Sequence, residues 1–314
     1  MTDCPICNSP AHAVEELYDD RFGHPGRYSI RQCDRCGHCF VEKPFTSEEL
    51  ARLYTSHYQR SHFELSDFTP VKKAGGFIGW LNGENQAAYC WVPRDVRVLD
   101  VGCGVGETLA YHASRGCRAY GLEVDENVKH IADSLGLTIA IGTLESNPFE
   151  PDFFDVITMD QVVEHVSEPV STLKEAFKIL KPGGRVILST PNSRGWGRTV
   201  FGRRWINWHT PYHLNIFSKK SMRTAVENAG FEVEKILSLT SANWLYFQLI
   251  HVVLYPAQGI PSVYWSKERP WKFWELWMRR GIKILHLLKM THAVTRFWDL
   301  LGAGDNMVIL LRKK

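Results

Sequence analysis

The sequence predicts an α/β fold built on a doubly wound parallel sheet. Between residues 96 and about 233, short runs rich in β-branched residues alternate with amphipathic helical segments, which is the pattern of parallel βαβ units. The 314 residues are 44% apolar and 23% charged, close to the average soluble protein, so the composition supports a sizeable core and excludes wholesale disorder. No fixed-period repeat or low-complexity tract is present, which excludes solenoid and fibrous architectures.

The elements follow one another in a regular order. Predicted strands cover residues 96–101, 118–123, 137–141, 155–159, 185–190 and 231–239. Predicted helices between them cover residues 107–115, 127–135, 170–180 and 219–229. An aromatic and basic segment then interrupts the alternation, and residues 305–311 read as one last strand. The interrupting segment is therefore interpreted as an insertion.

The N-terminal segment predicts a metal site. Two Cys-x2-Cys pairs separated by 25 residues offer four thiolates to one tetrahedral Zn²⁺; they are Cys4, Cys7, Cys33 and Cys36. His38 and Cys39 lie close enough to compete as ligands, but the paired spacing favours Cys36. Four thiolates leave no open position for water, so the zinc would be structural. The N-terminus lacks a basic and apolar secretory signal, which predicts a reducing cytoplasm and disfavours disulfides.

A glycine loop follows the first predicted strand. Asp100 precedes Gly102, Gly104 and Gly106, and a predicted helix begins directly afterwards. Glycines let the backbone turn and approach a ligand, while the helix start presents unpaired amides. The Gly-x-Gly-x-Gly spacing differs from that of dinucleotide-binding loops. Glu123 ends the next strand, where a carboxylate can accept hydrogen bonds from ribose hydroxyls.

This stretch resembles the class I S-adenosylmethionine-dependent methyltransferases, whose motif is an acidic residue, Gly-x-Gly-x-Gly and a later ribose-binding acid. The later blocks are also similar: residues 143–145 match the adenine region, residues 154–161 the fourth strand, and Lys181-Pro182-Gly183-Gly184 the turn into the fifth. The resemblance implies a Rossmann-like seven-stranded, mostly parallel sheet with an antiparallel last strand. It also implies that the cofactor S-adenosylmethionine is bound by Asp100, Gly102, Cys103, Gly104, Glu123, Val124, Thr143, Leu144, Asp160 and Gln161.

Two histidines are candidate catalytic bases. Methyl transfer to a hydroxyl is an in-line displacement that needs alignment and a group to remove the proton. His165 follows the fourth strand, beside Glu164, and His213 follows the fifth in a His-x-x-x-His pattern with His209. An imidazole suits this task because its ordinary pKa is near neutrality. Both histidines could also serve only to anchor their loops.

Two resemblances bear on the acceptor. Residues 160–165 resemble the ubiquinone-pathway O-methyltransferases, whose Glu-x-x-Glu-His is associated with a divalent metal, but Gln161 stands in place of the first Glu and disfavours a catalytic Mg²⁺. Across the chain, the cysteine ribbon, the aromatic stretch of residues 43–58 and the core are similar to bacterial methyltransferases that act on sugars. A sugar in a nucleotide- or lipid-linked glycan intermediate is therefore the expected acceptor, and a quinone-like or other small-molecule hydroxyl is the alternative.

Other function classes are less well supported. Nucleic acid is disfavoured as a partner, because the net charge is only +3 and no Asn/Asp-Pro-Pro-Tyr/Phe motif follows the fourth strand. A non-catalytic cofactor-binding protein is disfavoured because the glycine loop and Glu123 are intact.

The insertion predicts contact with a membrane. Residues 241–300 hold six of the 11 tryptophans and an excess of about five positive charges. Trp271, Trp274 and Trp277 at helical spacing, followed by Arg279 and Arg280, are typical of an interfacial helix. Residues 242–300 are therefore expected to bring the protein to the inner face of the cytoplasmic membrane. A lid or a dimer helix is the alternative, and the oligomeric state is left open.

The chain divides accordingly into five parts. Residues 1–45 form the predicted zinc ribbon, 46–94 a helical linker or lid, 95–240 the S-adenosylmethionine-binding core, 241–303 the insertion and 304–314 the final core strand.

Overall fold

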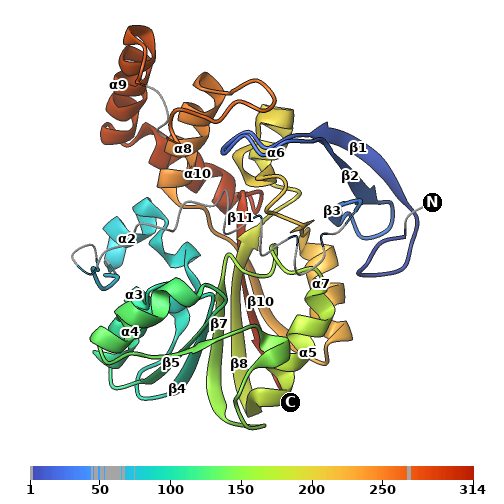
Figure 1. Cartoon of the computed structure of the whole chain (residues 1–314), viewed down its shortest axis with the longest axis vertical. Helices are drawn as coiled ribbons and strands as arrows, with labels where there is room; N and C mark the ends of the chain where they lie inside the picture. The colour runs from blue at the N-terminus through green and yellow to red at the C-terminus, as the bar shows by residue number, and fades with distance from the viewer. Residues whose placement is uncertain are drawn as a thin grey trace.

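The centre of the molecule is a seven-stranded sheet flanked by helices on both faces (Figure 1). The computed structural model describes residues 3–43, 45, 49, 53, 65, 68–73, 75–266 and 270–314. The sheet runs in the order β10-β11-β8-β7-β4-β5-β6. Its strands are β4 (Arg97–Val101), β5 (Arg118–Glu123), β6 (Thr138–Ile141), β7 (Phe154–Asp160), β8 (Leu180–Pro191), β10 (Glu232–Ser238) and β11 (Asn306–Arg312). The last strand, β11, is antiparallel to both of its neighbours, as predicted.

The two faces of the sheet are buried by different helices. α3 (Glu107–Ala113) and α4 (Lys129–Ser134) lie on one side, and α5 (Pro169–Ile179) and α7 (Lys219–Asn228) on the other (Figure 1). Within β4, Leu99 packs into the cluster that contains the α5 and α7 side chains, whereas Val98 packs into a cluster on the opposite face. Successive strand residues point to opposite faces, so a strand buried on both sides is apolar throughout. This explains the β-branched runs in the sequence.

A second, four-stranded sheet holds the N-terminal segment. Its order is β1 (Ala11–Leu17), β2 (Tyr28–Cys33), β3 (Cys39–Val41) and β9 (Asn215–Ile216), so its last strand comes from the region predicted as core. The Ser218 hydroxyl donates to the Cys36 carbonyl at 2.7 Å, and the Asn228 side chain donates to the Ile6 carbonyl at 3.1 Å. The cysteine-bearing segment is therefore anchored to α7 of the core.

The described residues of the insertion form three helices, which lie beside the short helix α2 (Gly76–Asn82). They are α8 (Ala242–Val253), α9 (Phe273–Leu287) and α10 (Met290–Leu300), and α9 projects at one end of the molecule (Figure 1). Arg296 of α10 donates to the Trp80 carbonyl of α2 at 2.7 Å, which ties the two segments together. No helix in the described ranges combines the length and apolar character needed to span a membrane.

The prediction that Trp271, Trp274 and Trp277 share one helix is wrong for Trp271. Trp271 precedes α9, because the Lys272 amide donates to Glu275 at 2.7 Å and this cap starts the helix at Phe273. The Trp271 ring instead packs against Tyr264 and beneath the Arg279 guanidinium. Trp274 and Trp277 remain exposed.

The remaining elements are short and connect the parts already described. They are α6 (Trp196–Phe201) and the 3-10 turns η2 (Glu84–Gln86), η3 (Ala88–Trp91), η4 (Glu126–Val128), η5 (Leu144–Ser146), η6 (Gly202–Arg204) and η7 (Ile206–Trp208). The turn η4 replaces the start of the helix predicted over 127–135. Most of the aromatic stretch of residues 43–58, used above to compare acceptor classes, lies outside the described residues.

Candidate active site

The glycine loop lies at the carboxyl end of β4 and adopts the conformation that its glycines permit. Gly102, Gly104 and Gly106 all have positive φ, and Gly106 is the N-cap of α3. A Cβ on Gly102 would lie 2.7 Å from the Val162 side chain, and one on Gly106 would lie 2.6 Å from Leu137. A Cβ on Gly104 would meet no heavy atom within 4 Å. The loop is thus closely packed on both sides and borders open space at Gly104, where a ligand can approach the backbone.

Glu123 ties the glycine loop to the turn after β5. Its Oε2 accepts a 2.8 Å hydrogen bond from the Gly104 amide, and its Oε1 accepts from the amides of Val124 and Asp125 at 2.9 and 3.2 Å. The carboxylate is buried, whereas the Val124 side chain is exposed. The arrangement places an acidic group next to the Gly104 amide, and the predicted ribose contact of Glu123 stays a prediction.

Asp100 is held beneath the loop by two threonines. Its carboxylate accepts hydrogen bonds from the hydroxyls of Thr108 and Thr158, the latter at 2.7 Å. Burial raises the pKa of this carboxyl. These bonds join β4, β7 and α3, so in this structure Asp100 supports the loop, and its predicted contact with the methionine end stays a prediction.

The other predicted cofactor residues lie around the same strand ends. Cys103 is buried beside Gly104, and burial raises the pKa of its thiol. Thr143 caps the η5 turn after β6 through a reciprocal arrangement with Ser146, and Leu144 is buried. This turn follows β6, the strand next to β5, and the predicted adenine contact of Thr143 and Leu144 stays a prediction.

Asp160 and Gln161 lie at the end of β7 and bond across the sheet. Asp160 accepts from the Ser189 hydroxyl of β8 and, at 3.2 Å, from the Ala88 amide. Burial raises its pKa to about 6. The Gln161 amide donates to Ser189 and to Asn306, both at 2.9 Å. Gln161 therefore connects β7, β8 and β11 through a side chain that is neutral.

Both predicted catalytic histidines meet at one carboxyl group. Glu164, His165 and His213 each offer a side-chain atom, and these atoms lie within 4.8 Å of one another. The His165 and His213 ring centroids are 4.6 Å apart, and His209 lies 4.8 Å from His213. The segment is next to the glycine loop, because β7 pairs with β4 and Val162 packs against Gly102.

The hydrogen bonds of the two histidines define their tautomers. His165 Nδ1 lies 3.0 Å from the Tyr212 carbonyl, and His213 Nδ1 lies 2.8 Å from the Asn207 carbonyl. Because a carbonyl only accepts, each Nδ1 carries the proton, and each neutral ring keeps a lone pair on Nε2. Two proton-accepting nitrogens therefore belong to this cluster.

Burial raises the proton affinity of Glu164 and lowers that of His213. It raises the pKa of the Glu164 carboxyl to about 8. Burial, with the neighbouring His165 ring and the positive charge of Arg21, holds the pKa of His213 well below its ordinary value. Glu164 Oε2 accepts from Thr190 at 3.0 Å, and Oε1 has no hydrogen-bonding partner among the described residues. A carboxyl with a pKa near neutrality beside neutral imidazoles is a typical acid–base site.

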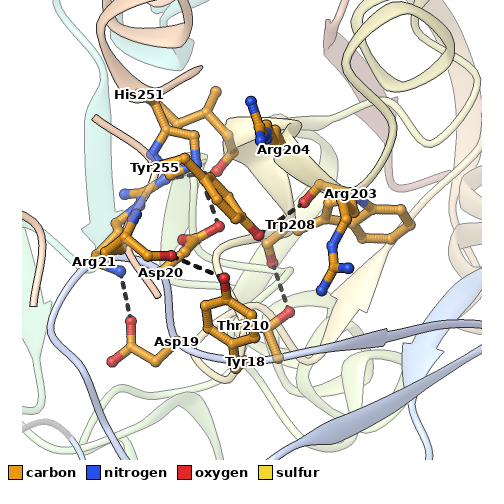
Figure 2. A network of polar contacts seen from close by, with 12 residues as sticks. Tyr18, Asp19, Asp20, Arg21, Arg203, Arg204, Trp208, Thr210, His251 and Tyr255 are labelled. Carbon is orange, nitrogen blue, oxygen red and sulfur yellow. Dashed lines mark hydrogen bonds and ion pairs between the residues drawn. The ribbon is translucent and has the colours of Figure 1, made fainter. Parts of the chain in front are cut away.

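The loop between β1 and β2 reaches the same region, which sequence reasoning missed. Figure 2 shows the network around Asp19, Asp20 and Arg21, which meets residues of the insertion and of the segment before His209. Asp20 Oδ2 lies 3.2 Å from His251 Nε2, and the Arg21 guanidinium donates to the Ile206 carbonyl at 2.6 Å.

Aromatic contacts bring this loop to the histidines. Phe22 lies edge-on to Tyr212 at 5.6 Å and 6.4 Å from the His209 ring. The only signal in the sequence is a charged Asp-Asp-Arg run in a loop, and its partners are far away along the chain.

The four predicted zinc ligands form one cluster. Cys4 Sγ lies 3.7 Å from Cys36 Sγ, and Cys7 Sγ lies 3.5 Å from Cys33 Sγ. All four sulfurs lie within 4.8 Å of one another. Zn–S bonds of about 2.3 Å in a tetrahedron place sulfurs about 3.8 Å apart, so the donor set and its spacing fit zinc.

The two competing ligands have other contacts. His38 Nε2 lies 3.0 Å from the Asn215 side chain, and Cys39 Sγ lies 3.3 Å from an Arg198 nitrogen. Within the described residues, the metal-type cysteine cluster therefore contains Cys36 and not Cys39.

The chain is similar to known methyltransferases. Residues 37–236 match the sequence profile of a family described as "Methyltransferase domain". A "Ubiquinone biosynthesis O-methyltransferase" of Pseudomonas fluorescens is 31% identical over 189 residues, which cover 56% of this chain and 77% of that protein. A "Probable S-adenosylmethionine-dependent methyltransferase" of Mycolicibacterium smegmatis is 33% identical over 144 residues, 45% of this chain. The chain spans 54% of the length of that second relative.

A solved structure also resembles this chain. A SAM-dependent methyltransferase from Archaeoglobus fulgidus superposes with a TM-score of 0.44 at 18% identity, covering 76% of this chain and 90% of that one.

Proposed function

The chain belongs to the methyltransferase-domain family, a membership carried by 200 matched residues, and we propose that it methylates a sugar hydroxyl with S-adenosylmethionine as donor. The acceptor would be a nucleotide- or lipid-linked glycan intermediate. The observation that carries the proposal is the convergence of Glu164, His165 and His213 beside the glycine loop.

The residues at the ends of β4 and β5 fit the cofactor. The open space at Gly104 gives a ligand access to the backbone, and Glu123 places a carboxylate beside it. We assign Glu123 to the ribose hydroxyls and Gly102 and Gly104 to the methionine end. Thr143 and Leu144 would border the adenine. When bound, S-adenosylmethionine supplies an electrophilic methyl group on a sulfonium, so the protein's task is alignment and proton removal.

The histidine cluster would take the acceptor proton. His213 keeps a lone pair on Nε2 because its Nδ1–H donates to the Asn207 carbonyl, and the pKa of the Glu164 carboxyl is about 8. As methyl transfer proceeds, the acceptor hydroxyl must lose its proton to a group within hydrogen-bonding reach. We assign this step to His213, whose neutral ring accepts the proton on Nε2, with His165 fixed beside it. Glu164 can take the proton on from His213 only in its ionised form, which is populated as the pH approaches 8.

The polar surroundings support a sugar acceptor. Burial lowers the pKa of His209, and Arg21 from the N-terminal sheet and His251 from the insertion both lie close enough to lower it further. Asp20 contacts His251 at 3.2 Å. A polyhydroxylated ligand needs several donors and acceptors around it, whereas an apolar ring needs apolar walls. The same two segments, the cysteine-bearing sheet and the insertion, also distinguish this chain from a methyltransferase core alone.

A phenol is the second candidate acceptor. It is favoured by the identity with proteins named ubiquinone biosynthesis O-methyltransferase. The Glu164 and His165 pair would serve both candidates, because either hydroxyl must lose a proton. Gln161 bonds Ser189 and Asn306, and this arrangement gives no support to a metal at its position.

We further propose that Cys4, Cys7, Cys33 and Cys36 bind one structural Zn²⁺. The metal would hold the two cysteine turns together at one end of the β1–β2 hairpin. It would thereby help to position the loop at the other end of the hairpin, which carries Arg21.

An acceptor panel tests the proposed function. Purified protein is incubated with labelled S-adenosylmethionine and with nucleotide sugars, polyprenyl-linked glycans and catechol-type phenols in separate reactions. Label in a sugar fraction, lost in Glu123→Ala, supports the proposal. Label in the phenols alone would transfer the assignment to the second candidate, and label in neither class would remove both.

A further inference from the structure

The insertion and α2 carry an apolar surface that the methyltransferase core does not use. Of the twenty large apolar side chains that are exposed in the described part of the chain, thirteen lie within residues 273–301 and three lie on α2. The three on α2 are Phe77, Ile78 and Trp80. Such a concentration marks an interaction site, because scattered exposed apolar residues are ordinary but contiguous ones are rare.

Helix α9 directs its apolar face outward. Only Glu275 and Ile282 of this helix are buried. On the opposite side lie Phe273, Trp277, Ile284 and Leu288 at the C-cap, 77%, 55%, 56% and 66% exposed. Their spacing of 4, 7 and 4 residues places them in one line along the helix. An apolar line facing away from the protein's own core requires another apolar surface to cover it.

The charged residues around the apolar line of α9 indicate which kind of partner covers it. Five exposed cations border it: Lys272, Arg279, Arg280, Lys283 and Lys289. Within residues 270–301, all described, the two carboxylates are turned away. Glu275 is buried, and Asp299 is buried in an ion pair with Arg296 at 2.6 Å.

A second copy of this chain fits such a surface poorly. An isologous contact would bring this cation-rich patch against a copy of itself, and residues 76–82 and 270–301, all described, offer no exposed carboxylate to compensate the charge. An anionic lipid surface supplies both the apolar depth and the negative charge. Indoles such as Trp274 and Trp277 prefer the depth of the lipid headgroups.

We propose that α9, α10 and α2 form a docking surface for an anionic phospholipid membrane, with α9 lying in the interface. This surface lies at the active-site end of the molecule. α10 leads into β11, whose first residue, Asn306, accepts a hydrogen bond from Gln161 at the carboxyl end of β7. A membrane bound here would lie near the acceptor side of the enzyme. The docking itself does not depend on which acceptor is methylated.

Vesicle sedimentation tests the proposal on the full chain. Vesicles of phosphatidylcholine alone and of phosphatidylcholine with phosphatidylglycerol are mixed with the protein at low and high salt. We expect binding to the phosphatidylglycerol vesicles that falls at high salt, because screening weakens the attraction of the cations. Replacing Phe273, Trp277, Ile284 and Leu288 by serine should lower the partition coefficient at least tenfold.

Matched variants keep the result interpretable. Val200→Ser with Ile260→Ser removes apolar side chains of similar exposure elsewhere, and should leave the binding unchanged. Arg280→Glu with Lys283→Glu should abolish the preference for phosphatidylglycerol, whereas Arg118→Glu with Lys174→Glu, on exposed residues of the core, should not.

Three results would overturn the proposal. The first is absence of sedimentation with phosphatidylglycerol vesicles at low salt. The second is binding that the serine variant leaves intact. The third is a dimer in analytical ultracentrifugation that the same serine substitutions dissociate, which would identify the occupant as a second copy. Methyl transfer to a water-soluble nucleotide sugar is measured separately, so a failure of docking and a failure of the proposed function are distinguished.

Discussion

The backbone amide of Gly104 donates a 2.8 Å hydrogen bond to the Glu123 carboxylate. This bond connects the loop after β4 with the end of β5, and it holds a carboxylate beside Gly104, where an added Cβ would meet no heavy atom within 4 Å. Glu123 thus joins the glycine loop to the turn after β5, and we propose that it also binds the ribose. The first prediction tests this relationship.

Glu123→Ala should weaken binding of S-adenosylmethionine by roughly 1.5–3 kcal/mol, the value of a hydrogen bond to a charged group. Gly104→Ala should weaken binding as well, because its Cβ would occupy the open space at the loop. Isothermal titration calorimetry gives both affinities. Glu126→Ala, an exposed acid three residues further on, is the control and should bind normally. Unchanged affinity in both test variants would contradict the assignment of the cofactor site.

The cysteine cluster should hold one zinc ion per chain. Elemental analysis of protein purified without chelator measures it, and the Cys4→Ser, Cys7→Ser double variant should lose the metal. Cys39→Ser is the matched control, because Cys39 lies in the same sheet but contacts Arg198. A metal-free protein with all eight thiols free would count against the site.

Loss of His213 should affect catalysis and not cofactor binding. His213→Ala should lower turnover by roughly 10²–10⁴, as expected when a general base is removed. Calorimetry should give a nearly normal affinity for S-adenosylmethionine. His130→Ala, on the exposed surface of α4, should behave as wild type. Full activity in His213→Ala would assign the proton to His165 or Glu164, or to no base.

Glu164 should make stability depend on pH. Its folded-state pKa is about 8, above the ordinary value of 4.5, so between these values the folded protein keeps a proton that the unfolded chain releases. The stability from this group is present below about pH 4.5 and is lost as the pH rises to about 8.

Glu164→Gln removes this dependence, because an amide does not titrate. The melting temperature of the variant should therefore fall less between pH 5 and pH 8.5 than that of the wild type. Differential scanning calorimetry at pH 5, 7 and 8.5 measures the difference, with Glu168→Gln as an exposed control. Parallel curves for wild type and Glu164→Gln would show that Glu164 keeps an ordinary pKa.

Much of the core could be predicted because its signals are local. The strand that carries Asp100 is a buried apolar run with two valines, and the glycines that follow it need positive φ, so both features can be recognised from neighbouring residues. The cysteine pairs could likewise be predicted, since the turn between two ligands determines their spacing.

The rest depends on contacts between residues far apart in the sequence. The Arg21 guanidinium donates to the Ile206 carbonyl, 185 residues away along the chain, and the periodicity of the sequence does not predict such a partner. For α9, the indole pattern was visible, but the bond from Lys272 to Glu275 starts the helix after Trp271. Periodicity also identifies an apolar face without telling whether it points to the core or outward. In α9 that face, with Trp277 and Ile284, points outward.

The most direct test of methyl transfer to a sugar oxygen is the identity of the product. The reaction is run with S-adenosylmethionine carrying a ¹³C-labelled methyl group and the best sugar acceptor, and the product is analysed by ¹³C NMR. We predict one labelled methoxy carbon on the sugar for each S-adenosylhomocysteine released. A label bonded to carbon or nitrogen, or release of S-adenosylhomocysteine without a labelled sugar, would contradict the assignment.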